Sequence, residues 1–159
     1  MLTYREIRQT DDKALAGIIR TNLKAHGLDI PGTVYFDDNL DHLSDFYLED
    51  KSERYYLIAL KDDKVAGGVG LASVEFIEDC AELQKLYLDD ANKGKGYGYI
   101  LIDMIEEKAR ELGYKKMYLE THTNLSAAIH IYEKCGYEEI PKPECAVHST
   151  MNRFFIKEL

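Results

Sequence analysis

A sequence of 159 residues, 45% hydrophobic and 31% charged, has the composition of a soluble globular protein and the length of one domain with a sizeable core. Its net charge of −9 at pH 7 argues against general nucleic-acid binding, which needs a basic surface. The charge is compatible with a cationic substrate such as an amine, or with solubility alone. No apolar run approaches the roughly 20 residues that cross a bilayer, and the N-terminus lacks a secretion signal.

The three cysteines, Cys80, Cys135 and Cys145, are an odd number and include no Cys-x-x-Cys pair. This pattern argues against a disulfide framework and against a zinc site, and it favours the reducing cytosol. We therefore expect a cytoplasmic protein without a bound metal ion and without a membrane partner.

The N-terminal third predicts a strand followed by two helices. Alternating residues over Leu2–Arg8 indicate an edge strand. Thr10 and the two acids after it begin a helix, whose apolar residues keep helical spacing until Gly27 ends it. A shorter helix is expected over Asp41–Leu48. Between the helices, the segment 35–38 (Tyr-Phe-Asp-Asp) either lines a substrate opening or packs as an ordinary loop.

From Arg54 the hydrophobic period changes to two, which predicts a β-hairpin. The first strand alternates up to Leu60, a polar turn follows, and Val65–Phe76 continues as the partner strand. The second strand is interrupted by Gly67, Gly68 and Gly70. Glycines inside a strand mark a bulge or the close approach of another backbone.

The next strand changes its hydrophobic phase part of the way along. Ala81 and Leu83 share one face, but the aliphatic positions then move to Leu86 and Leu88. A phase change within a strand is typical of a β-bulge, because one extra residue exchanges the two faces. We therefore expect a bulge in this strand.

A glycine-rich loop follows the strand and opens a helix. Every second residue of Gly94–Tyr99 is glycine, and an apolar helical pattern begins at Ile100. Glycine lets backbone N–H groups approach a ligand closely, and a first helical turn leaves N–H groups unpaired, so the loop favours phosphate binding. Lys93 and Lys95 stand at this loop, with Lys85 nearby in sequence. A tight turn without a ligand is the alternative.

Two common phosphate loops do not fit this stretch. The P-loop needs a hydroxyl residue after Gly-Lys, and the dinucleotide fingerprint needs a third glycine where Tyr99 stands. A nucleotide-binding protein would also need an acidic ribose or magnesium motif, which we do not find. The pattern that fits is Lys93-x-x-Gly96-x-Gly98.

The remainder of the chain predicts alternating helices and strands. The helix after the loop has an apolar face and a charged face, to which Glu106 is assigned, and Gly113 ends it. A strand over Lys115–Thr121 then makes a crossover between parallel strands. Further elements are a helix over Ser126–Cys135, a strand over 137–140 and a last strand over Val147–Lys157. The expected fold is one α+β domain, residues 1–159, with a mixed sheet.

Two segments resemble the signatures of one family. Lys93-x-x-Gly96-x-Gly98 resembles the pyrophosphate loop (Gln/Arg)-x-x-Gly-x-(Gly/Ala) of the Gcn5-related N-acetyltransferases, the GNAT family, with lysine as a departure at the first position. The stretch after Thr123 resembles the second GNAT signature. Asn124 stands one residue before the usual asparagine, where this chain has Leu125. The positions that match are Ala128, Tyr132, Gly136 and Tyr137. The resemblance covers the whole chain in element order and implies a layered α/β/α fold with a partly splayed sheet.

The resemblance also implies a cofactor, acetyl-CoA, and the residues that bind it. Backbone groups of Leu86, Tyr87 and Leu88 would hold the acetyl–pantetheine arm, and the amide of Leu88 would hold the thioester carbonyl. Asn124, Ala128 and Tyr132 would add contacts from the second signature. The pyrophosphate loop would comprise Lys93, Gly94, Lys95, Gly96, Tyr97, Gly98 and Tyr99.

Tyr132 occupies the family position of the general acid that protonates the thiolate of coenzyme A. A phenol with a reference pKa of about 10 keeps its proton at pH 7, although packing on its helix is the alternative role. Glu82 is the candidate general base, and Glu120, His122 or a water chain are its rivals. His148 could reach the acceptor pocket or serve a structural role.

The sequence thus predicts an acetyl-CoA-dependent N-acetyltransferase that acts on a primary amine of a small molecule by direct attack in a ternary complex. Two alternatives stay open: a protein or peptide amine as acceptor, and an acyl-CoA-binding regulatory module without turnover. Dimers are common in the family, so a homodimer is a possible assembly. No motif names the acceptor.

Overall fold

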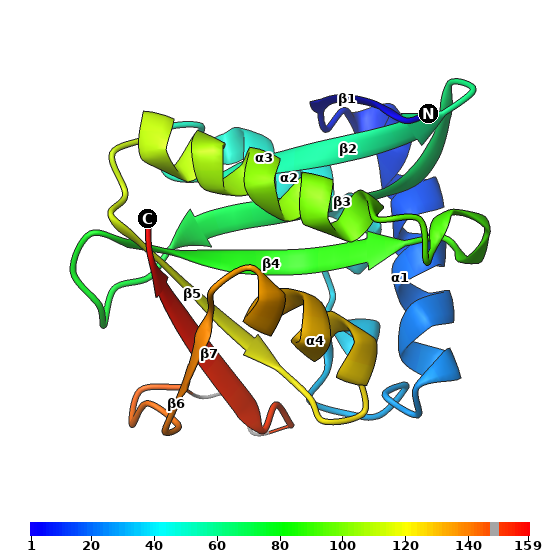
Figure 1. Ribbon diagram of the computed structural model, residues 1–159. Coiled ribbons are helices and arrows are strands. Elements are labelled where there is room, and N and C mark those ends of the chain that lie inside the picture. Colours follow the sequence, from blue (N-terminus) through cyan, green and yellow to red (C-terminus); the bar gives the residue numbers. More distant parts are fainter. Residues whose placement is uncertain (147–149) are drawn as a thin grey trace.

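The computed structural model of the protein describes residues 1–146 and 150–159 (Figure 1). In these ranges seven strands form one mixed sheet in the order β1-β2-β3-β4-β5-β7-β6. The strands are β1 (Thr3–Glu6), β2 (Tyr55–Lys61), β3 (Lys64–Ser73), β4 (Cys80–Leu88), β5 (Lys116–Thr121), β6 (Glu138–Ile140) and β7 (Arg153–Glu158). The α-helices are α1 (Asp12–Ala25), α2 (Leu43–Glu49), α3 (Tyr97–Glu111) and α4 (Ser126–Lys134). The predicted α+β fold with a mixed sheet is confirmed, and β1 is an edge strand as expected.

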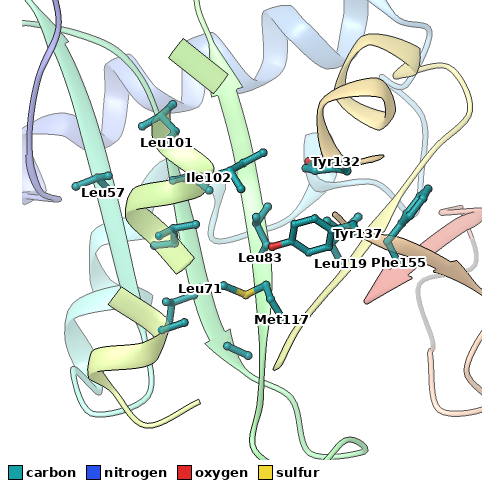
Figure 2. Packing of buried hydrophobic residues seen from close by; sticks show 14 of the residues in the cluster. Leu57, Leu71, Leu83, Leu101, Ile102, Met117, Leu119, Tyr132, Tyr137 and Phe155 are labelled. Carbon is teal, nitrogen blue, oxygen red and sulfur yellow. The ribbon is translucent and has the colours of Figure 1, made fainter. Parts of the chain in front are cut away.

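The helices form a layer on each face of the sheet, α3 and α4 on one side and α1 and α2 on the other (Figure 1). Alternation along β2 explains how one strand serves both layers. Leu57 and Ala59 join the core under α3, whereas Tyr56 and Ile58 join the core under α1. Figure 2 shows the first of these cores, in which residues of α3 and α4 pack against β3, β4 and β5.

Acidic residues fix the entry to α1. The carboxylate of Asp11 accepts hydrogen bonds of 2.7 and 2.9 Å from the guanidinium of Arg5 and one of 2.8 Å from the backbone N–H of Arg8. The carboxylate of Asp12 accepts bonds from the backbone N–H and the hydroxyl of Ser44, at 2.9 and 2.6 Å. These contacts tie the start of α1 to β1 and to α2.

A Cβ at Gly67 would lie 2.1 Å from the backbone oxygen of Tyr87, so the expected close approach of another backbone is confirmed there, and Gly68 and Gly70 make room for two tyrosine rings. A Cβ at Gly70 would lie 2.6 Å from the ring of Tyr56 and 3.0 Å from that of Tyr47. A Cβ at Gly68 would lie 2.5 Å from the Tyr56 ring. Because both tyrosines are fully buried beside β4, these glycines determine how β4 is supported.

The structure corrects four sequence-based expectations. β3 ends at Ser73 rather than at Phe76, and α3 begins at Tyr97, so part of the glycine-rich stretch is already helical. β7 begins at Arg153, while Val147 and His148, placed in that strand from the sequence, lie outside the described residues. Glu106 is buried rather than exposed, because the side chain pairs with Lys157 and Tyr137.

Within the described ranges, none of the helices combines the length and the hydrophobicity that crossing a bilayer requires.

Candidate active site

β4 contains a bulge and separates from β5 halfway along its length. Gly70 lies opposite Gln84 but Gly68 lies opposite Tyr87, so β4 has one extra residue, which confirms the predicted bulge. Lys85, at the bulge, has a φ of 51°, in the left-handed region that non-glycine residues rarely adopt. β4 pairs with β5 only over Cys80–Glu82, and the two strands diverge beyond that point (Figure 1). The second half of β4 therefore presents a backbone edge without a neighbouring strand.

The peptide of Leu88 faces this opening. The following residue, Asp89, donates its N–H to the carbonyl of Ala66 at 2.8 Å. Because successive N–H groups of a strand point to opposite sides, the N–H of Leu88 points away from β3. The Leu88 carbonyl accepts a hydrogen bond of 2.9 Å from the side-chain amide of Asn22 in α1. That bond fixes the orientation of the peptide at the end of β4.

The glycine-rich loop presents backbone N–H groups next to this edge. Gly94 and Gly96 have φ angles of 72° and 83°, and a Cβ at either would meet open space, so backbone conformation alone requires glycine there. α3 starts directly after Gly96, so the N–H groups of its first turn lack intrahelical partners. Lys93 pairs with Asp90 at 2.9 Å and adds positive charge to the loop. The arrangement suits an anion.

A cavity of about 550 Å³ joins the loop to the opening in the sheet. Its lining comes from β4, from the glycine loop and α4, and from α1 with the segment that follows α1. The combination of a free strand edge and an amide-rich loop fits a pantetheine arm joined to a pyrophosphate. A more open hollow lies at the start of β4, beside Cys80 and Tyr114, and none of the predicted catalytic or cofactor-binding residues lines it.

Tyr132 reaches the cavity from α4. Its side chain is 6% exposed, and its ring packs near those of Tyr137 and Phe155, with centroids 6.0 and 6.4 Å away (Figure 2). The hydroxyl makes no hydrogen bond to any residue in the described part of the chain. Burial raises the pKa of Tyr132 above its ordinary value, and the neighbouring Tyr87 and Cys135 add to this. The phenol is therefore protonated at neutral pH and lines the cavity.

Glu82 belongs to a hydrogen-bonded chain on the other face of β4. One carboxylate oxygen accepts a bond of 2.8 Å from the amide nitrogen of Gln84. The Gln84 oxygen in turn accepts a bond of 2.7 Å from the hydroxyl of Tyr47. Glu82 lines the cavity, so the chain holds a carboxylate at the cavity wall.

The two rival bases differ in position. Glu120 lines the cavity, and its carboxylate accepts a hydrogen bond of 2.7 Å from the hydroxyl of Tyr118. His122 does not line the cavity, and its Nδ1 accepts a bond of 3.1 Å from the backbone N–H of Asn124. The structure therefore places Glu82 and Glu120 together and leaves His122 outside. The placement of His148 is not described.

The structure brings most of the expected cofactor residues to the cavity, with two exceptions. Asn124 does not line the cavity; its side-chain amide donates to the carbonyl of His26 at 3.0 Å and so ties the loop before α4 to the end of α1. Lys95 is exposed beside the loop and does not line the cavity either. The expected residues that line it are Leu86, Tyr87, Leu88, Lys93, Gly94, Gly96, Tyr97, Gly98, Tyr99, Ala128 and Tyr132.

Asn22, Lys85 and Asp37 are among the cavity-lining residues to which the sequence alone assigns no definite role. Asn22 is a buried polar residue within the apolar pattern of α1, and that exception was the available signal. Lys85 was noted only for its place in the sequence, and no local pattern shows which way a bulge turns a side chain. Asp37 follows the short turn Val34–Phe36, so the segment 35–38 does contribute to the cavity through this residue.

Comparison with known proteins places the chain in a family. A model of the acetyltransferase (GNAT) family matches residues 20–137. The N-acetyltransferase YjgM of Escherichia coli K12, whose function is uncharacterized, is 38% identical over 86% of this chain and 81% of its own. Spermidine N(1)-acetyltransferase of Vibrio cholerae is 28% identical over 64% of this chain and 59% of its own.

Solved structures share the fold. A GNAT acetyltransferase from Staphylococcus aureus Mu50 superposes with a TM-score of 0.85 at 20% identity, covering 100% of this chain and 99% of its own. The PaiA N-acetyltransferase of Thermoplasma acidophilum, solved with coenzyme A, has a TM-score of 0.79 at 18% identity, covering the same shares. The chain therefore belongs to the acetyltransferase (GNAT) family and is an acetyl-CoA-dependent N-acetyltransferase.

Proposed function

We propose that the protein transfers the acetyl group of acetyl-CoA to a primary amine of a small molecule, by direct attack within a ternary complex. The observation that carries the proposal is the single cavity described above, which joins an amide-rich loop to a strand edge, a buried phenol and carboxylates. Two relatives support a small amine as acceptor: the spermidine acetyltransferase and, at 29% identity, a streptothricin acetyltransferase.

Acetyl-CoA, when bound, supplies an acyl group activated as a thioester. The amides of the glycine loop and the first turn of α3 bind the pyrophosphate. The N–H of Leu88 donates to the thioester carbonyl oxygen, where negative charge develops during attack. Asn22 holds the Leu88 peptide through the carbonyl, so this donor is oriented before the substrates bind.

Two side chains on opposite faces of β4, Glu82 and Tyr132, carry out the proton transfers. The attacking amine must lose a proton, and Glu82 accepts it directly or through water, held in position by Gln84 and Tyr47. The departing sulfur must gain a proton, and the hydroxyl of Tyr132 donates it. Glu120 is the alternative acceptor of the amine proton, since it also lines the cavity.

A thermal-shift titration with acetyl-CoA tests the donor site. A ligand at about 100 times its Kd stabilises the native state by roughly 2.7 kcal/mol, which is easily detected. We expect a rise in Tm with acetyl-CoA and none with ATP or NAD at equal concentration. Thiol release in the presence of amines, spermidine included, then tests turnover. Equal shifts with all three ligands, or none with acetyl-CoA at millimolar concentration, would contradict the proposal.

A further inference from the structure

The bulge in β4 turns one cationic side chain into the cavity. Without the extra residue, Lys85 would alternate away from Gln84; with it, both residues line the cavity, where Gln84 bonds to Tyr47 and Lys85 lies within the influence of the charges of Asp37 and Glu82. The hydroxyl of Tyr56 donates a hydrogen bond of 2.7 Å to the Lys85 carbonyl and so holds the left-handed backbone at this position. A non-glycine residue held in a strained conformation inside a cavity is typical of functional sites.

Among the residues that the structure describes, none binds the ammonium group of Lys85 directly. Two lysines line the cavity, and Lys93 pairs with Asp90 near the glycine loop. Lys85 makes neither an ion pair nor a side-chain hydrogen bond with any residue the structure describes. Burial lowers the pKa of Lys85, while the charges of Asp37 and Glu82 oppose that shift. A partly buried ammonium without a direct partner is costly unless a ligand supplies one.

The acceptor side of the cavity therefore carries charges of both signs. Asp37, Glu82 and Glu120 are carboxylates that suit an amine, and Lys85 suits an anion. A polyamine such as spermidine has only positive charges and would place one of them near Lys85. An acceptor with an amine and an anionic group would match both.

We propose that Lys85 binds an anionic group of the acceptor, so that the substrate is an amine that also carries a carboxylate or a phosphate. This inference rests on the proposed function and narrows its substrate class. Carboxylate and phosphate share the same chemistry toward an ammonium, since both accept charge-assisted hydrogen bonds.

Matched acceptor pairs test the proposal. Each pair differs by one anionic group: lysine and cadaverine, tyrosine and tyramine, glucosamine 6-phosphate and glucosamine, with spermidine as a further amine. The initial rate of thiol release gives kcat/KM for each acceptor. We expect the wild type to prefer the anionic member of at least one pair by about tenfold or more. Which pair responds distinguishes carboxylate from phosphate.

Variants at Lys85 then assign the preference to this residue. Lys85→Met should lower kcat/KM for the preferred anionic acceptor by about tenfold or more, mainly through KM, and leave kcat/KM for the pair member without the anionic group little changed. Lys85→Arg keeps the charge and should retain most of the preference. Lys115→Met removes an exposed charge at the start of β5, outside the cavity, and should match the wild type.

The outcomes distinguish failure of the Lys85 proposal from failure of the proposed acetyltransferase function. Preference for spermidine or for the pair members that lack the anionic group, or an unchanged ratio in Lys85→Met, would overturn the Lys85 proposal while acetyl-CoA binding stands. If no acceptor turns over, calorimetry of the protein saturated with coenzyme A decides, because failure of every anionic acceptor to bind also overturns it. A missing thermal shift with acetyl-CoA in the wild type would instead remove the proposed function. Lys85→Gln replaces Lys85→Met if the latter does not fold.

Discussion

At the scale of single residues, Tyr132 is the proposed proton donor because a buried, protonated phenol lines the cavity. We predict that Tyr132→Phe lowers kcat by about a hundredfold, within the usual range for a general acid, and leaves the affinity for acetyl-CoA nearly unchanged. Steady-state kinetics and the thermal-shift titration measure the two effects. Tyr114→Phe removes a phenol far from the cavity, one that donates to the Glu53 carbonyl, and serves as the control. An unchanged kcat in Tyr132→Phe would rule out the acid role.

Glu82 is the other residue whose role depends on a proton. We predict that Glu82→Gln abolishes the acidic limb of the kcat/KM profile against pH, because the amide cannot accept the amine proton. Rates measured across the pH range for wild type and variant give the result, with the exposed Glu78→Gln as control. Retention of the wild-type limb would remove Glu82 from the mechanism, and the same measurement on Glu120→Gln would then follow.

At the scale of elements, a hydrogen bond from the core residue Tyr56 supports the β4 bulge beside the cavity. The Tyr56 hydroxyl is the group that satisfies the carbonyl at the bulge. We predict that Tyr56→Phe lowers the free energy of unfolding by about 1–2 kcal/mol, since a partly buried carbonyl loses its donor, and also lowers kcat. Urea denaturation and kinetics measure both. Tyr55→Phe, on the opposite face of β2 beneath Lys108, should change neither. If Tyr56→Phe lowers the free energy of unfolding but leaves kcat unchanged, the hydrogen bond at the bulge does not contribute to catalysis.

The entry to α1 gives a prediction about pH. Burial acts to raise the pKa of Asp11, but hydrogen bonds from Arg5 and Arg8 outweigh it and hold the pKa below the ordinary 3.8. A lowered native pKa means that the carboxylate stabilises the fold fully above 3.8 and that this is lost as pH falls through the native value. We predict that Asp11→Asn is less stable than wild type at pH 7 and that the difference shrinks toward low pH. Urea midpoints along the pH range test this, and a constant difference would contradict it.

At the scale of the whole molecule, one buried charge joins the two halves of the sheet. Glu106, 3% exposed in α3, accepts hydrogen bonds from Lys157 of β7 at 2.8 Å and from the Tyr137 hydroxyl at 2.9 Å. The pair therefore links α3, which packs on β3 and β4, to β7 on the far side of β5.

We predict that Glu106→Gln lowers the free energy of unfolding by about 3 kcal/mol, because Lys157 loses its partner in a poorly solvated place. Urea denaturation measures the change. Glu107→Gln is the matched control on the same helix: its carboxylate is exposed and pairs with Arg110, so about 0.5 kcal/mol or less is expected. Equal effects of the two variants would show that Glu106 does not act as a buried ion-pair partner.

Most of the elements, their order and the glycine turns could be predicted from the sequence, because these depend on local periodicity and on backbone rules. Gly27, Gly113 and Gly136 follow their helices with positive φ, and the phase change in β4 corresponds to the observed bulge. Element ends were less certain: α3 begins before its apolar pattern does, since small and aromatic residues fill its first turn.

The surroundings of each bulged or buried polar residue depend on the packing of the whole fold and could not be predicted from local patterns. Glu106 stands among charged residues along α3, and its burial depends on Lys157, 51 residues away. Asn22 contacts the Leu88 carbonyl, and Lys85 shares the cavity with Asp37, although in each case the two residues belong to segments that are distant in the chain. Local patterns report which face of an element is apolar, but the partner of a polar group is set by the packing of other elements against it. For that reason the sequence predicted most of the residues at the glycine-loop end of the cavity, and it did not predict the polar residues that α1 and the bulge contribute.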